Sequence, residues 1–84
     1  MRLVFRVHAV ERMFQHDVDE ENIRHVVEDD ETIKEYPDDT PYPSRLILGW
    51  RASRPIHVVA ADDAENERTF IVTVYEPDFR RKRA

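Results

Sequence analysis

The front of the chain carries apolar residues at a helical period. Between residues 8 and 16 they fall at positions i, i+1, i+4 and i+5, which form one stripe on a helix: Ala9, Val10, Met13 and Phe14. The polar residues of this segment gather on another side of the same helix: His8, Glu11, Arg12 and Gln15. The pattern predicts an amphipathic helix from about His8 to His16.

A second helix is predicted after a break at residues 17–19. Asp19 is a suitable N-cap, and Glu20 and Glu21 follow in the first turn, where the helix dipole favours negative charge. We expect this helix to end near Glu28. Its buried side is predicted to contain Ile23, Val26 and Val27.

The remainder of the chain is typical of strands. Three runs rich in apolar and β-branched residues follow one another: 46–52, 56–62 and 68–76. Their connections, residues 53–55 and 63–67, are short, which predicts antiparallel neighbours in a meander. Residues 32–36 are a further strand candidate, and residues 2–6 are either an edge strand or the lead-in to the first helix.

The order of helices and then strands predicts an α+β fold. Two N-terminal helices are expected to pack on one face of a three- to four-stranded antiparallel sheet, leaving the other face free for a site. Because 84 residues support only one core, we expect a single domain over residues 1–79 and a basic tail over residues 80–84.

Composition excludes several classes of protein. The chain has no cysteine, so disulfides and thiolate metal sites are ruled out. A single glycine, Gly49, falls inside a predicted strand and cannot build a phosphate-binding loop. No spacing matches a metal motif, so no metal and no cofactor is expected. Without a signal peptide or an apolar run of about 18 residues, the protein is predicted to be cytoplasmic, with no membrane partner.

The net charge of −5 comes from one segment. Residues 17–40 carry eleven acidic and two basic side chains, whereas residues 1–16 and 41–84 are each mildly basic. Overall acidity argues against a general phosphate binder. A basic face with an acidic lobe elsewhere remains compatible with these numbers.

Strand alternation brings a polar group together on the free face. One set is predicted to be buried: Ile56, Val58 and Ala60 with Phe70, Val72 and Val74. If the connecting loop is centred near Glu65, His57 lies opposite Thr73 on the other face, with Tyr75 one diagonal step away.

These residues are the components of metal-free RNA cleavage. His57 and His8 would act as acid and base, one taking the proton of the ribose 2′-hydroxyl and the other protonating the leaving 5′-oxygen. Arg12, one helical turn after His8, would stabilise the phosphate charge. Tyr75 and Thr73 would orient the substrate.

Each of these residues also has an ordinary structural interpretation. A strand histidine commonly packs across strands, a histidine at a helix start commonly caps it, and an arginine on a helix commonly pairs with a nearby acid. The basic tail is predicted to contact RNA or a partner protein through Arg80, Arg81 and Lys82, although such tails often serve only solubility.

Several short motifs also resemble a known family in their order and spacing. They are His8-Ala9-Val10-Glu11-Arg12-Met13, Asp19-Glu20-Glu21-Asn22-Ile23, Tyr36-Pro37-Asp38-Asp39, Pro41-Tyr42-Pro43, Arg54-Pro55-Ile56-His57-Val58-Val59 and Thr73-Val74-Tyr75-Glu76-Pro77. Together they resemble an uncharacterised prokaryotic domain family that is similar to the RelE/MqsR/BrnT-like toxins of toxin–antitoxin systems.

The resemblance implies a RelE/barnase-like fold and a metal-independent endoribonuclease toxin of a type II toxin–antitoxin pair. It implies RNA as the substrate and a zinc-finger or helix-turn-helix antitoxin as the partner. Carried over by position, its candidate catalytic residues are His8, Arg12, His57, Thr73 and Tyr75.

Two other functions stay open from the sequence. The chain could be a non-catalytic protein-interaction module that uses its acidic loop and a sheet edge, or a small-ligand-binding domain. An exposed sheet edge would also allow a homodimer.

Overall fold

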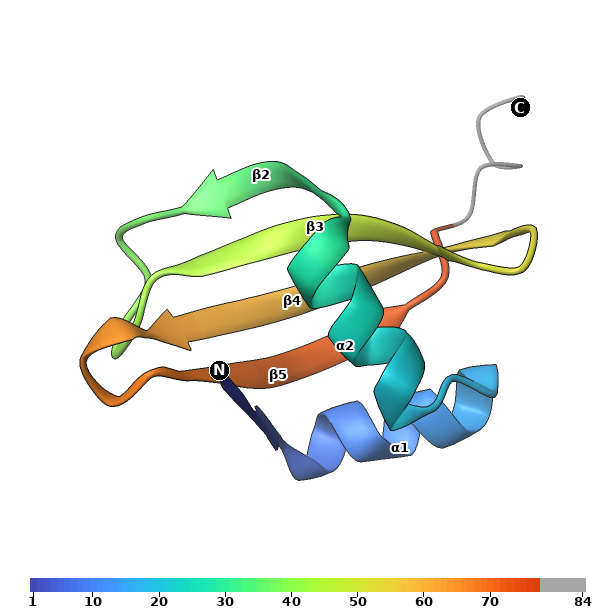
Figure 1. Ribbon diagram of the computed structural model, residues 1–84, viewed down its shortest axis with the longest axis horizontal. Coiled ribbons are helices and arrows are strands. Elements are labelled where there is room, and N and C mark those ends of the chain that lie inside the picture. Colours follow the sequence, from blue (N-terminus) through green and yellow to red (C-terminus); the bar gives the residue numbers. More distant parts are fainter. Residues whose placement is uncertain (78–84) are drawn as a thin grey trace.

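The computed structural model describes residues 1–77 of the chain, and the predicted contacts of Arg80, Arg81 and Lys82 lie outside this range. It has an α+β fold in which two helices accompany one sheet (Figure 1). In chain order the elements are β1 (Arg2–Phe5), α1 (Val7–His16), α2 (Glu20–Asp29), β2 (Glu31–Tyr36), β3 (Ser44–Arg51), β4 (Arg54–Asp63), the 3-10 turn η1 (Ala64–Asn66) and β5 (Arg68–Tyr75).

The sheet has five strands in the order β1-β5-β4-β3-β2. The meander from β2 to β5 is antiparallel, as the short connections predicted. β1 lies parallel to β5, with Arg2 opposite Arg68 and Phe5 opposite Ile71. The expectation of three to four antiparallel strands was therefore only partly right: β2 to β5 are antiparallel, but β1 adds a parallel strand, because it pairs with a strand far along the sequence.

The two helices occupy different places on this sheet. α2 crosses one face over β3 and β4, and α1 runs along the β5 edge (Figure 1). Asp19 caps α2 as predicted: its side chain accepts a hydrogen bond from the Asn22 backbone N–H at 2.8 Å, and the Asp19 backbone N–H donates to Oδ1 of Asn22 at 3.1 Å. Within residues 1–77, neither helix has the length and apolar character needed to cross a membrane.

The core lies between α2, α1 and the face of the sheet that they cover. Its buried apolar residues include the predicted Ile23, Val26, Val27, Ile56, Val58 and Ala60. Gly49 allows α2 to approach closely, because a Cβ at this position would lie 2.5 Å from a Val26 methyl carbon.

The predicted apolar stripe of α1 is only partly buried. Ala9 is fully buried and Met13 packs against the core, whereas Val10 and Phe14 face solvent. The reason is the position of α1 along the sheet edge, which covers a narrower strip of the helix than a position over the sheet face would.

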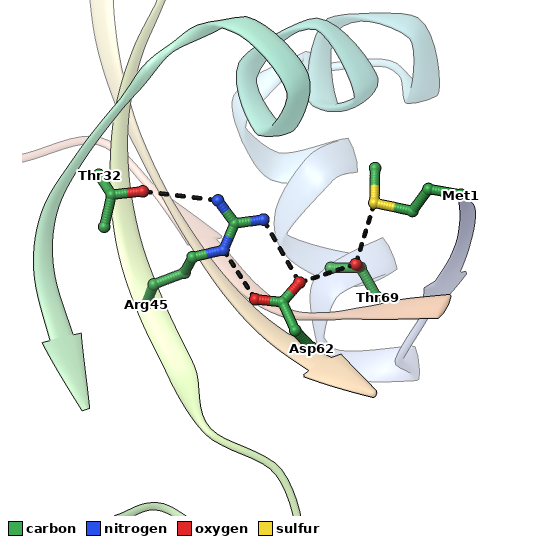
Figure 2. A network of polar contacts seen from close by, with 5 residues as sticks. All are labelled: Met1, Thr32, Arg45, Asp62 and Thr69. Atoms are coloured by element: carbon green, nitrogen blue, oxygen red, sulfur yellow. Dashed lines mark hydrogen bonds and ion pairs between the residues drawn. The ribbon is translucent and has the colours of Figure 1, made fainter. Parts of the chain in front are cut away.

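A polar network ties the strands together at one end of the sheet (Figure 2). Arg45 of β3 binds both carboxylate oxygens of Asp62 on β4, at 2.8 and 3.3 Å. The hydroxyl of Thr69 on β5 lies 2.9 Å from Asp62 and 3.1 Å from the sulfur of Met1, and Arg45 reaches Thr32 of β2 at 3.5 Å. The network therefore joins β2, β3, β4 and β5 to the residue that precedes β1.

Candidate functional site

β4 and β5 place His57 and Tyr75 side by side on the face of the sheet that α2 leaves uncovered. The two residues are directly paired across the strands, and their rings meet edge to face with centroids 5.1 Å apart. This face carries the alternate positions of β4, whose other positions, Ile56 and Val58, are buried in the core. The predicted grouping of His57 and Tyr75 on one open surface is therefore present.

The pairing partner of His57 differs from the prediction. His57 lies opposite Tyr75, and Thr73 lies opposite Val59. The register shifts between Val59 and Ala60, where Val72 is an extra residue on β5 without a partner on β4. Strict alternation could not anticipate this bulge.

The bulge also changes which residues of β5 are buried. Thr69, Ile71 and Val74 are buried, whereas Val72 is exposed. The predicted buried set of Phe70, Val72 and Val74 was therefore wrong in its first two members. Because the extra residue lies before Thr73, it leaves Thr73 and Tyr75 on the same face as His57.

His57 is partly desolvated by its neighbours. It is half-buried between Leu48, its partner on β3, and Tyr75 on β5. Burial lowers the pKa of the His57 imidazole below its ordinary value. Its Nδ1 atom is buried and has no hydrogen-bond partner within residues 1–77. The neutral imidazole is thus favoured near pH 7, which suits a group that accepts a proton.

A hollow of about 430 Å³ lies on the same face, next to this pair. Its lining comes from the start of α1, from the segment before β3, and from β3, β4 and β5: Arg6, His8, Asp39, Thr40, Pro41, Tyr42, Ser44, Val59, Ala61 and Val72. Val59 follows His57 by two residues on β4 and so points to the same side of the sheet. His8 therefore lines a hollow on the same face of the sheet as His57, although His57 itself does not line it.

The rim of the hollow is polar and held in place by local contacts. The Ser44 hydroxyl donates to the Asp39 carboxylate at 2.5 Å. The guanidinium of Arg6 lies over the ring of Phe70 at 4.8 Å, and that ring stacks on Tyr42 with centroids 5.4 Å apart. The hollow thus combines a small apolar floor with one carboxylate and one fixed cation.

Arg12 shares a side of α1 with His8 but does not line the hollow. Its side chain is half-buried and donates to Gln15 at 3.2 Å. Arg6 is the guanidinium that lines the hollow. Arg6 was not predicted as a site residue because it precedes the predicted helix. Its position two residues before His8 was the one sequence feature that could have indicated it.

The segment between β2 and β3 was also missed as part of the site. Asp39 and Tyr42 belong to motifs on which the family resemblance is based, but no site role was predicted for them. Their contribution depends on how this loop folds back over β4 and β5, which local sequence patterns do not specify.

No cluster of three or more histidine, aspartate or glutamate side chains in the described part of the chain is arranged to hold a metal ion. The groups that the open face does present are two imidazoles, a phenol, a guanidinium and a carboxylate. Chemically, such a set can bind an anion, move protons and hold a polar ring against an apolar floor.

Comparison with known proteins places nearly the whole chain in one family. The model of the family described as "Domain of unknown function (DUF4258)" matches residues 5–76. This range contains His8, His57 and Tyr75 and all residues that line the hollow. No curated protein and no solved structure matches the chain. The match confirms the predicted membership of a small uncharacterised domain family and makes no link to RelE-like toxins.

Proposed function

The chain belongs to the DUF4258 domain family, and we propose that it acts as a metal-independent endoribonuclease, the toxin of a type II toxin–antitoxin pair. The observation that carries the proposal is the contact of His57 with Tyr75 on the open face, at 5.1 Å between ring centroids. The second imidazole, His8, lines the adjoining hollow.

In the proposed reaction His57 is the base. Because burial lowers its pKa, its neutral form is available near pH 7 to take the proton of the ribose 2′-hydroxyl. The freed 2′-oxygen attacks the neighbouring phosphorus, and the bond from phosphorus to the 5′-oxygen breaks. A cyclic 2′,3′-phosphate and a new 5′-hydroxyl result.

The remaining groups of the site have supporting roles in this proposal. His8 gives a proton to the leaving 5′-oxygen, and Arg12 stabilises the additional phosphate charge, assisted by Arg6 at the rim of the hollow. Tyr75 and Thr73 orient the substrate from β5. The antitoxin would be a small zinc-finger or helix-turn-helix protein, and the RelE-like character of the fold is part of the same proposal.

The experiment that tests this proposal compares His57→Ala with wild type after inducible expression and in purified form. Loss of a general base lowers catalysis about 10²- to 10⁴-fold, so we expect growth arrest and RNA cleavage to disappear. His25→Ala is the matched control, because His25 is an exposed histidine on α2 that pairs with Asp29. Circular dichroism checks that both variants fold. Undiminished toxicity and cleavage in His57→Ala would refute the assignment.

A non-catalytic interaction module is the second candidate function. It is favoured by exposed apolar side chains on α1, among them Phe14. Wild-type protein that leaves RNA intact under all conditions, yet forms a defined complex with a partner, would favour this function over the nuclease.

A further inference from the structure

An apolar stripe of α1 faces solvent. Val7, Val10 and Phe14 lie at positions i, i+3 and i+7, which form one line along a helix. Phe14 is 83% exposed and Val7 is 75% exposed. Contiguous apolar surface of this kind commonly marks an interaction site.

A cavity of about 460 Å³ adjoins this stripe where α1 ends and α2 begins. We call it the α1–α2 groove; its lining residues are Phe5, Val10, Met13, Phe14, Asp17, Val18, Asp19, Glu20 and Arg51. Five of these nine are apolar, so the floor can receive apolar side chains. None of them lines the hollow next to His57, so the two places are separate.

The polar edge of the α1–α2 groove is acidic. It has three carboxylates, on Asp17, Asp19 and Glu20, and one guanidinium, on Arg51. Arg51 lies 3.5 Å from Asp17 and offsets that charge. The carboxylates of Asp19 and Glu20 therefore make the net charge of this edge negative, and they would attract a partner with positive charges.

We propose that the α1–α2 groove binds an amphipathic, basic helix of another protein. The apolar side of that helix would cover the stripe and fill the cavity, and its lysines or arginines would face Asp19 and Glu20. This inference concerns a surface away from His57 and does not depend on the nuclease activity.

The test uses synthetic helical peptides and the full chain. The probe peptide carries leucines at i, i+3 and i+7 flanked by lysines and arginines, and the comparison peptide has the same leucines flanked by glutamates. Fluorescence anisotropy measures affinity, and NMR shift changes locate the contact. We expect the basic peptide to bind at least about tenfold more tightly than the acidic one and to shift the resonances of α1 and of the start of α2.

Two pairs of variants make the test specific. Phe14→Ser should weaken binding about tenfold or more, whereas Ile33→Ser, at an exposed residue on the opposite edge of the sheet, should not. Because Phe14 is exposed, its replacement leaves the core intact. Glu20→Lys should weaken binding more than Glu21→Lys, since both lie in the first turn of α2 but only Glu20 lines the groove.

Three results would overturn the proposal. They are equal binding of the basic and acidic peptides, shifts centred on His57 instead of α1, and a concentration-dependent dimer that Phe14→Ser converts to a monomer. The last would show that a second copy of the chain covers this surface. RNA cleavage measured on Phe14→Ser separates this question from the proposed function, because that variant should cleave RNA as wild type does.

Discussion

Within residues 1–77, three residues other than glycine have positive φ angles, and each lies where an element ends: Asp17, Ala52 and Glu67. Asp17 ends α1, Ala52 follows β3, and Glu67 precedes β5. The left-handed conformation crowds the Cβ atom of an ordinary residue, and glycine avoids this cost. The one glycine of the chain is used elsewhere, in β3 under α2. The turns therefore carry local strain that substitution can relieve.

Ala52→Gly should stabilise the protein. Ala52 has a φ of 56° at the first position of the two-residue turn between β3 and β4, where glycine is preferred. We expect the free energy of unfolding to rise by about 0.5 kcal/mol. The strain energy removed from the folded state exceeds the cost of the extra conformational entropy that glycine gives the unfolded chain. Thermal unfolding measures it. Ser53→Gly, at the next position and without a positive φ, should instead lower the melting temperature.

His57 should make stability depend on pH in a defined direction. Because burial lowers its pKa in the folded state, the unfolded state takes up a proton first as the pH falls. The contribution of His57 is thus fully present above its ordinary pKa of 6.5 and is lost as the pH falls from there through the folded-state pKa. Urea unfolding at pH 7.5 and 5.5 should show that wild type loses more stability between these two pH values than His57→Gln does. An unchanged difference between the two proteins would contradict this.

At the scale of elements, the close contact of α2 with β3 depends on Gly49. An alanine Cβ there would lie 2.5 Å and 2.8 Å from the two methyl carbons of Val26 and 2.8 Å from a carboxylate oxygen of Asp30. Val26 is β-branched and almost fully buried, so it has little freedom to move aside. The helix would have to shift away from the sheet.

Gly49→Ala should therefore destabilise the fold by about 1–3 kcal/mol, the usual cost of overpacking. Urea unfolding measures the change. Val26→Ala makes room for the new methyl group, so the double variant Gly49→Ala/Val26→Ala should be more stable than the two single losses added together predict. Strict additivity would show that the contact with Val26 is not the cause.

Elements with a local signature could be predicted from the sequence, and their long-range relations could not. The Asp19 cap and the buried positions of β4 follow from spacing alone. The parallel pairing of β1 with β5 and the bulge at Val72 depend on distant strands, and local periodicity carries no information about them. For the site, the pairing of His57 with Tyr75 resulted from a register two residues away from the predicted one, and the lining by Arg6 and Asp39 required the folded loop.

At the scale of the whole molecule, the acidic charge of the chain is concentrated in one segment, of which one carboxylate, that of Asp39, lines the hollow on the proposed RNA-binding face. Residues 17–40 hold eleven of the 18 acidic side chains. The cations and imidazoles near this hollow are Arg6 and His8, which line it, and Arg12, one helical turn after His8. Few cations are available there, so we expect RNA binding to depend only modestly on salt.

The salt dependence of RNA binding tests the predicted role of the basic tail. With two or three phosphate contacts, affinity for single-stranded RNA should fall roughly tenfold between 50 and 200 mM salt. Additional contacts from Arg80, Arg81 and Lys82 would make the slope of log affinity against log salt concentration more negative by about 2. A variant with glutamine at these three positions should then show the shallower dependence. Identical slopes for variant and wild type would remove the tail from the interface.

The parallel pairing of β1 with β5 has a consequence for synthesis. Translation produces β1 long before β5, the strand with which it pairs, so Arg2 is made well before its partner Arg68. Until the last strand has left the ribosome, α1 has no edge to lie on and Tyr75 has not yet reached His57. Nascent or prematurely terminated chains without β5 thus lack the pairing of His57 with Tyr75, so the proposed toxicity would be confined to chains that include this strand.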